Sequence, residues 1–388
     1  MTDAEKITLI RAEMPAVANR VYLNTGTCGP LSSITIGAIN QINADELALG
    51  RADAGGFKLL AQALAETRAA FARLVKADPA QIALTHHTTE GMNIVAHGLT
   101  WQPGDEVITT TSEHDGGLLP LYVLRQRYGI TLKLVDLTPG DVLAQLEAAF
   151  TPHTRLLVFS HVTWNTGLRL PLSELVALAH RHYALTLVDG AQSAGAIPLD
   201  LPASGVDFYA LPGQKWLCGP EGTGALYVRH DRLSLLGLTF AGYSSIVESG
   251  YDLTGYFMPA KGARRYEVGS IYRPGVKGMI ANLDWLEQTV GWEWIHARIE
   301  HLAAYARQAL SRLPGATILT PPGPQAGLIT FNVPGLDPAR TTTKLTEEGI
   351  IVRFIRQPYA LRISTGFYNT EDDIDRLVET LAGYLKAG

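Results

Sequence analysis

One lysine stands in a stretch with unusual neighbours. Lys215 lies in LPGQKWLCGPEGTG (211–224), between glycines, prolines and bulky apolar residues. A lysine is rarely buried without a partner, so two interpretations are open. The side chain lies on the surface with its ammonium in water, or it lies in a pocket where a lowered pKa frees the amine to attack a carbonyl.

Three further polar residues are predicted to follow strands of a sheet. Asp189 comes directly after LTLV, Asn165 lies in HVTWNTG, and His114 ends EVITTTSEH (106–114). In a parallel sheet, ligands bind beyond the carboxyl ends of the strands. Each residue also has a structural interpretation: a turn cap for Asp189, an Asx turn for Asn165 and a packing role for His114.

The stretch HHTTEGMNIVAHGL is predicted to begin a helix, with Thr88 and Thr89 in its N-cap region. Hydroxyls and free N–H groups at a helix N-terminus bind anions, although ordinary N-capping explains the same residues. The segment GPEGTG (219–224) matches neither GxGxxG nor the P-loop, and it is predicted to be a turn before a strand.

Taken in order, these residues suit the binding of pyridoxal 5'-phosphate (PLP). The phosphate needs a helix N-terminus (88–89), and the ring needs a flat partner such as His114. The pyridine nitrogen needs a carboxylate such as Asp189, and the aldehyde needs an amine such as Lys215.

The elements that must position these residues alternate between strands and helices from about residue 80. This alternation predicts an α/β fold whose mostly parallel sheet is flanked by helices. A smaller α+β domain follows a loosely patterned region at 230–275. We expect a large domain at 15–260 and a small C-terminal domain at 261–388 that also includes residues 1–14. The expected strands and helices lie at 106–114, 131–137, 155–162, 171–183, 185–190, 207–211, 224–229, 276–312, 326–333, 338–348, 350–355, 360–364 and from 371.

The composition excludes several classes of protein. The chain has 388 residues, a net charge of −5 and only two cysteines, Cys28 and Cys218. These features exclude a disulfide framework and a CxxC metal site, and they argue against a nucleic-acid partner. No apolar run reaches membrane-spanning length, and the N-terminus lacks the pattern of a secretion signal. We therefore expect a cytoplasmic protein with no membrane partner and no metal.

The chain resembles the class V aminotransferase family of fold-type I PLP enzymes. The resemblance runs from YLNTGTCGPLS (22–32) to LRISTGFYNTEDDID (361–375), and it is most specific in VDGAQSAG (188–195) and DFYALPGQKWLCGPEGTGALYV (207–228). It implies a homodimer whose active site is shared across the interface.

The resemblance also implies roles for individual residues. Lys215 matches the lysine that binds the cofactor aldehyde, Asp189 the partner of the pyridine nitrogen and His114 the ring-stacking residue. Arg362 matches the arginine that binds the substrate carboxylate. Further cofactor contacts are expected from Thr88, Thr89, Asn165, Gln192, Gln214 and, in the neighbouring subunit's site, Ser270; Arg353 and Thr25 are expected to contact the substrate.

Two departures from the family pattern bear on the reaction. Pro212 stands where the family often has a phosphate-binding hydroxyl, so one usual contact is missing. The loop IVRFIRQPYALRIS contains no cysteine, which argues against a persulfide-forming cysteine desulfurase; Cys28 remains without an assigned role. Within the family, the length, this cysteine-free loop and the ending RISTGFYN most resemble the cystine and cysteine C–S lyases. The resemblance therefore implies β-elimination from a sulfur-containing amino acid such as L-cystine or L-cysteine. An epimerase, an aminotransferase, a dinucleotide oxidoreductase and a non-catalytic binding protein are the alternatives.

Overall fold

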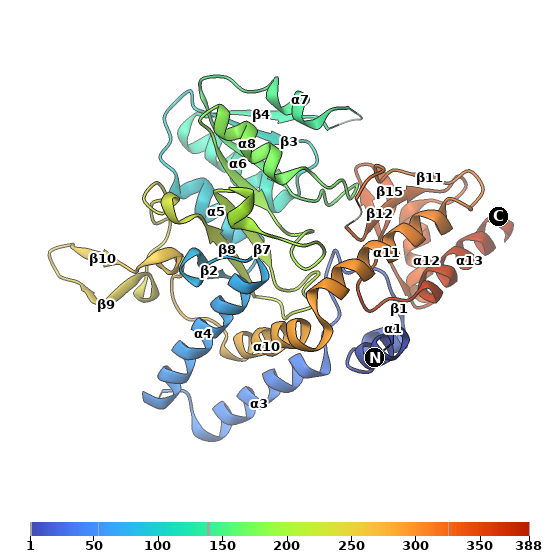
Figure 1. Cartoon of the computed structure of the whole chain (residues 1–388), viewed down its shortest axis with the longest axis horizontal. Helices are drawn as coiled ribbons and strands as arrows, with labels where there is room; N and C mark the ends of the chain where they lie inside the picture. The colour runs from blue at the N-terminus through green and yellow to red at the C-terminus, as the bar shows by residue number, and fades with distance from the viewer. Residues whose placement is uncertain (1, 53, 138–139, 325, 388) are drawn as a thin grey trace.

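The computed structural model describes residues 2–52, 54–137, 140–324 and 326–387 (Figure 1). Its centre is a seven-stranded sheet in the order β2-β8-β7-β6-β5-β3-β4. Only β8 runs antiparallel to its neighbours, so the sheet is mostly parallel, as predicted. The strands are β2 (Ile82–Thr85), β3 (Glu106–Thr110), β4 (Thr131–Val135), β5 (Thr154–Ser160), β6 (Leu185–Asp189), β7 (Phe208–Pro212) and β8 (Gly224–Val228).

Helices cover both faces of this sheet, which explains why its inner strands are apolar without alternation. In β5, Leu156 and Val158 belong to one buried cluster, whereas Leu157 and Phe159 belong to the other. The first cluster includes α5 (Thr88–Gly98) and α6 (Asp115–Tyr128). The second includes α4 (Ala54–Leu74), α8 (Leu172–Arg181) and α10 (Arg273–Asp284).

The predicted strand at 106–114 is too long. β3 ends at Thr110, because the Thr110 side chain accepts the N–H of Ser112 (3.1 Å) and donates to Glu113 (2.6 Å), which turns the chain. His114 is consequently the N-cap of α6 and not the last residue of a strand. The short strand β2 was not predicted, and neither was the hairpin of β9 (Ile246–Tyr251) and β10 (Phe257–Pro259), which projects from the molecule (Figure 1).

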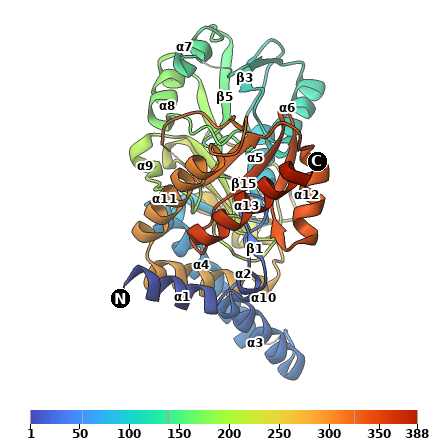
Figure 2. The same ribbon diagram turned by 90° about the vertical axis from the view of Figure 1, so that its right-hand side faces the viewer.

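A smaller antiparallel sheet has the order β11-β12-β15-β14. Its strands are β11 (Thr317–Ile318), β12 (Leu328–Asn332), β14 (Arg353–Arg356) and β15 (Tyr359–Ser364). The helices α11 (Trp292–Leu310), α12 (Pro338–Glu347) and α13 (Glu371–Ala387) pack against one face of it (Figure 2). The first half of α11 packs in the large core through Ile295 and Ile299, and its second half packs in the core of the smaller sheet. The boundary after residue 260 remains a prediction.

The N-terminal segment connects the two sheets. After α1 (Asp3–Ala12) and α2 (Pro15–Asn19), β1 (Val21–Tyr22) pairs in parallel with β13 (Ile350–Ile351). The chain then passes toward the large sheet and enters α3 (Ser33–Leu49), which packs against α10. The short helices α7 (Val142–Glu147) and α9 (Leu201–Ser204) complete the main elements.

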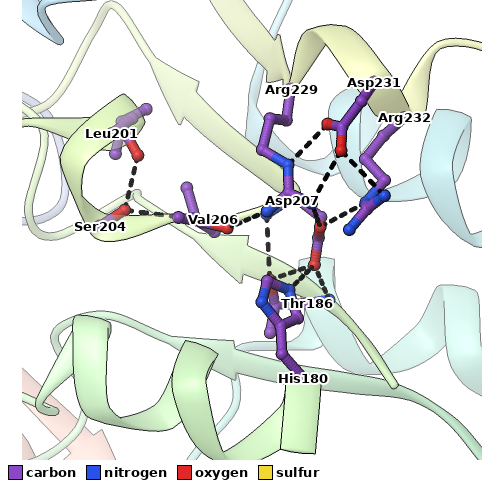
Figure 3. Close-up of polar contacts among 10 residues, drawn as sticks. His180, Thr186, Leu201, Ser204, Val206, Asp207, Arg229, Asp231 and Arg232 are labelled. Carbon is purple, nitrogen blue, oxygen red and sulfur yellow. Dashed lines mark hydrogen bonds and ion pairs between the residues drawn. The ribbon is translucent and has the colours of Figure 1, made fainter. Parts of the chain in front are cut away.

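A buried carboxylate connects β6, β7 and β8 through hydrogen bonds (Figure 3). It lies at the amino ends of the parallel strands, opposite the cavity end of the sheet. Asp207 is fully buried and accepts hydrogen bonds from the Thr186 amide (2.8 Å), from His180 Nε2 (2.8 Å) and from Arg232 Nε (2.7 Å). Burial raises the pKa of Asp207, but the hydrogen bonds from His180 and Arg232 outweigh burial and hold the pKa below its usual value. The described part of the chain contains no helix that is both long and apolar enough to span a membrane.

Candidate active site

A cavity of about 240 Å³ lies at the carboxyl ends of the parallel strands. It is lined from three sides: by the large sheet with its helices, by two arginines of the smaller sheet, and by the N-terminal segment. The lining residues are Gly26, Thr27, His87, Thr88, Thr89, His114, Ser160, Val162, Trp164, Asp189, Ala191, Gln192, Gln214, Lys215, Arg353 and Arg362.

Lys215 lies in the turn that follows β7. The Cys218 amide donates to the Lys215 carbonyl (2.9 Å), and the Gly29 amide donates to the Gln214 carbonyl (2.8 Å). A Cβ atom on Gly29 would overlap the Lys215 carbonyl oxygen, so glycine is required for this close approach. The side-chain amine of Lys215 makes no hydrogen bond or ion pair with any described residue. Burial lowers its pKa to about 8, against an ordinary value of 10.5.

Asp189 is the last residue of β6, and its Oδ1 accepts the Ala191 amide (2.8 Å). Asp189 is buried, lines the same cavity as Lys215, and raises the pKa of that lysine against the effect of burial. The structure therefore brings together the carboxylate and the amine that the sequence singled out.

His114 is half-buried on the cavity wall, and its Nδ1 accepts the amide of Gly116 (3.1 Å). Burial, followed by the charge of Lys215, lowers the pKa of His114. The ring is therefore neutral near pH 7, and the Gly116 hydrogen bond assigns its proton to Nε2. Trp164 contacts the ring edge-on, with a centroid separation of 5.3 Å.

The N-terminus of α5 also opens into the cavity. The N-cap is His87, which accepts the Glu90 amide (3.1 Å) through Nδ1; Thr88 and Thr89 are the first two helical residues and not the cap. The amides at these first positions have no intrahelical partner. Thr88 Oγ1 is buried without a hydrogen-bond partner among the described residues, so its hydroxyl is free to donate. This combination suits an anion such as a phosphate.

Two arginines of the smaller sheet meet at one hydroxyl. Arg362 Nη2 and Arg353 Nη1 both donate to Thr27 Oγ1, at 3.0 and 3.1 Å, and Arg362 Nη1 donates to the Trp164 carbonyl (2.8 Å). Arg362 is 1% exposed and its Nε has no partner. Burial and, secondarily, Arg353 lower the pKa of Arg362 to about 9. Neither guanidinium forms an ion pair with a described carboxylate, so the pair presents positive charge to an incoming anion.

The remaining predicted site residues differ in whether they line the cavity. Gln192 lines the cavity, with its amide bound to the Gly26 carbonyl (2.8 Å) and the Trp216 indole (2.8 Å). Asn165 is buried beside the cavity, where its Nδ2 lies 3.5 Å from the Gln357 carbonyl. Thr25 is also outside the lining, because its hydroxyl is buried against Tyr368 (2.6 Å).

Ser270 is exposed and does not line the described cavity of the same chain, and its hydroxyl contacts Tyr243 (3.0 Å). Its expected role toward a second subunit remains a prediction. Seven lining residues were not among the predicted site residues: Gly26, Thr27, His87, Ser160, Val162, Trp164 and Ala191. Trp164 and His87 each neighbour a residue that was singled out, and this adjacency was the one available signal.

The class V aminotransferase family model matches residues 35–377. The chain belongs to this family. Isopenicillin N epimerase of Streptomyces clavuligerus is 33% identical over 95% of the chain and 94% of its own length. A probable cysteine desulfurase of Methanothermobacter thermautotrophicus is 30% identical over 96% of both chains.

Solved structures of C-DES are similar over nearly the whole chain. A C-DES mutant with glycine covalently linked to its PLP cofactor has a TM-score of 0.92 and 34% identity, and it covers 96% of this chain and 98% of its own. The cystine C–S lyase C-DES with its product cysteine persulfide has a TM-score of 0.90, 34% identity, and coverage of 95% and 99%. The expected fold-type I architecture is therefore confirmed.

The residues of this class V family member also fit PLP. The cavity combines an unpartnered amine (Lys215), a buried carboxylate (Asp189), a neutral imidazole (His114) and a helix N-terminus beside the unpartnered Thr88 hydroxyl. Each group suits one part of the cofactor: aldehyde, pyridine nitrogen, ring face and phosphate. Family membership confirms PLP as the cofactor and places the chain among PLP-dependent enzymes.

Proposed function

We propose that the chain is a carbon–sulfur lyase that catalyses β-elimination from a sulfur-containing amino acid such as L-cystine or L-cysteine. The products are pyruvate, ammonia and a thiol, persulfide or sulfide. The observation that carries the proposal is the distribution of bases in the cavity. Lys215 is an unpartnered amine, whereas His87 and His114 both use Nδ1 to accept a backbone amide. Such a site supports removal of one proton by one base.

Each of these residues has a separate role in the proposed reaction. Arg362 and Arg353 bind the substrate carboxylate, and this fixes the Cα–H bond relative to Lys215. The free amine of Lys215 takes the Cα proton. PLP held in this cavity would supply an electron sink for the pair left at Cα, and Asp189 would balance the positive charge of its pyridine nitrogen. The Cβ–S bond then breaks, and sulfur leaves with the bonding electron pair. Lys215 returns its proton to the sulfur, and water hydrolyses the three-carbon remainder to pyruvate and ammonia.

The cysteines support elimination over desulfuration, because a desulfurase needs a reactive thiolate. Cys218 is fully buried, and burial raises its pKa far above the ordinary value. Cys28 is half-buried outside the cavity lining, and burial with the nearby Glu221 raises its pKa as well. The similarity to C-DES, a cystine C–S lyase, points the same way.

Epimerisation is the second candidate, because isopenicillin N epimerase is 33% identical over nearly the whole chain. An epimerase returns a proton to the opposite face of Cα and therefore requires a second acid–base group there. His114 lines the cavity, but its Nδ1 is engaged and its Nε2 already carries a proton. The hydrogen bonding thus favours elimination.

The deciding experiment measures pyruvate release from L-cystine and L-cysteine by the PLP-loaded protein. Lys215→Ala serves as the inactive control and Cys28→Ser as the matched cysteine control. We expect pyruvate that depends on Lys215 and is unaffected by Cys28→Ser. Incorporation of solvent deuterium at Cα with inversion of configuration, without release of pyruvate, would instead establish an epimerase. Accumulation of pyridoxamine phosphate would establish an aminotransferase.

We also propose that the enzyme is a homodimer in which Ser270 reaches the phosphate site of the partner subunit. The family resemblance supports this arrangement, and the exposed position of Ser270 is compatible with it. Sedimentation should give a dimer, and Ser270→Ala should lower PLP affinity without changing the dimer. A monomer with full PLP affinity would refute the arrangement.

A further inference from the structure

A second acid lies behind the cofactor site. Glu113 is 5% exposed, yet no described residue forms an ion pair with it. Its two carboxyl oxygens instead accept hydrogen bonds from hydroxyls: Oε1 from Thr110 (2.6 Å) and Oε2 from Ser160 (2.6 Å). A buried carboxylate without a cation is costly, and two hydroxyl donors compensate only part of that cost. None of the steps proposed above uses this group.

Glu113 is poised between its two protonation states near neutral pH. Burial raises its pKa, the hydrogen bonds from Ser160 and Thr110 lower it, and the charge of Asp189 raises it again, so that the pKa is about 7. The facing titratable group is Asp189 of β6. On its own segment, the next residue is His114, which is neutral near pH 7. A perturbed pKa on a buried group beside a cavity is typical of functional sites.

Ser160 connects this acid to the cavity. It is the last residue of β5, its Cα pairs in register with Asp189 of β6, and it lines the cavity beside Asp189. A serine hydroxyl has a single hydrogen and two acceptor lone pairs. That hydrogen points either to Glu113 or to the cavity, and Glu113 decides which.

We propose that Glu113 and Ser160 form a proton-dependent relay that sets the hydrogen bonding on the Asp189 side of the PLP site. When Glu113 is ionised, Ser160 donates to it and presents only lone pairs to the cavity. When Glu113 is protonated, its O–H donates to Ser160 Oγ, and the serine hydrogen turns toward the cavity and Asp189. One proton from solvent is bound to or released from the Glu113 carboxyl group, and no other covalent bond changes. Glu113 is thus a positioning residue, and its effect does not depend on which reaction the enzyme catalyses.

The test is spectroscopic and uses the PLP-loaded protein without substrate. Visible absorption and circular dichroism of the bound cofactor are followed across neutral pH in the parent, Glu113→Gln and Ser160→Ala. Glu106→Gln is the matched control, because Glu106 lies at the other end of β3 in contact with Lys133 (2.7 Å). We expect a component of the parent titration with a midpoint near pH 7. It should be lost in Glu113→Gln and in Ser160→Ala, with unchanged PLP content, and retained in Glu106→Gln.

Three results would overturn the relay. The first is that Glu113→Gln titrates like the parent. The second is that Ser160→Ala retains the component near pH 7, which would mean that Glu113 does not act through the serine. The third is that Glu106→Gln loses the component too. If Glu113→Gln does not fold, infrared difference spectra of the parent on either side of pH 7 provide the second measurement. They should show a protonated carboxyl band that disappears with the change in the cofactor band. A cofactor change without this carboxyl signal would also refute the proposal.

Discussion

Replacement of Arg362 by lysine tests how the site recognises a substrate carboxylate. Arg362 is buried, holds its guanidinium in place through the Trp164 carbonyl and Thr27 hydroxyl, and leaves Nε without a partner. A guanidinium binds a carboxylate through two parallel hydrogen bonds, whereas an ammonium acts as a point charge. Arg362→Lys keeps the formal charge and loses at least one of these two bonds.

The magnitude follows from that loss. A hydrogen bond to a charged group contributes about 1.5–3 kcal/mol, and each 1.36 kcal/mol corresponds to about tenfold in rate. Arg362→Lys should therefore lower kcat/KM for an amino-acid substrate by about 10- to 150-fold. Arg353→Lys is the matched control. Arg353 is only half-buried and its charge is better solvated, so the loss should be smaller, below about tenfold.

The assay compares each amino acid with the corresponding amine that lacks the carboxyl group. Measured pyruvate and aldehyde release give kcat/KM for both, and the ratio isolates the carboxylate contribution. Arg362→Lys should reduce this ratio while its PLP content and thermal midpoint stay near those of the parent. An unchanged ratio in Arg362→Lys, or a larger reduction in Arg353→Lys, would refute the assignment of Arg362 as the principal carboxylate ligand.

Further predictions concern stability and the pKa of Lys215. Asp207→Asn should lower the free energy of unfolding at pH 7 by about 3 kcal/mol in denaturant titrations, because it removes the charge shared by buried hydrogen bonds; the more exposed Asp231→Asn should cost less than about 0.5 kcal/mol. The folded-state pKa of Asp207 lies below the unfolded value, so its contribution is present above the unfolded pKa and is lost as pH falls through the folded pKa. The deficit of Asp207→Asn should shrink at acid pH, and a deficit independent of pH would contradict this reasoning. In the apo-protein, acetylation of Lys215 measured by mass spectrometry should show a midpoint near pH 8, and Asp189→Asn should move it lower because Asp189 raises that pKa; a midpoint near the ordinary 10.5 would exclude a desolvated amine.

The sequence predicted what depends on local pattern. Strands that are apolar on both faces, such as β5 and β6, stand out because both faces are covered. Asp189 is recognisable because it ends such a strand, and Lys215 because it lies among glycines, prolines and bulky apolar residues. By contrast, β2 has only four residues, and the exposed β9–β10 hairpin has no regular apolar alternation.

Contacts between distant residues were not predictable. Thr27 joins Arg362 across 335 positions of the chain, and nothing in either local stretch marks the pairing. Ser160 was not predicted as a site residue for another reason. It ends an apolar strand, and its position in the sequence is typical of a core residue. Thr25 was chosen over Thr27 by resemblance alone, and the structure separates them because Tyr368 holds the Thr25 hydroxyl away from the cavity.

The segment from residue 23 to residue 29 explains how the two sheets cooperate. The Leu23 carbonyl accepts the Ser364 amide (2.9 Å) at the end of β15, and the Gly29 amide donates to the Gln214 carbonyl (2.8 Å) beside Lys215. Between these two anchors, Thr27 binds both arginines. Arg353, Arg362 and Lys215 are therefore linked through one short stretch of backbone. In the proposed reaction, a substrate carboxylate bound by Arg362 would lie opposite Lys215, and we expect this stretch of backbone to set the distance between the two groups.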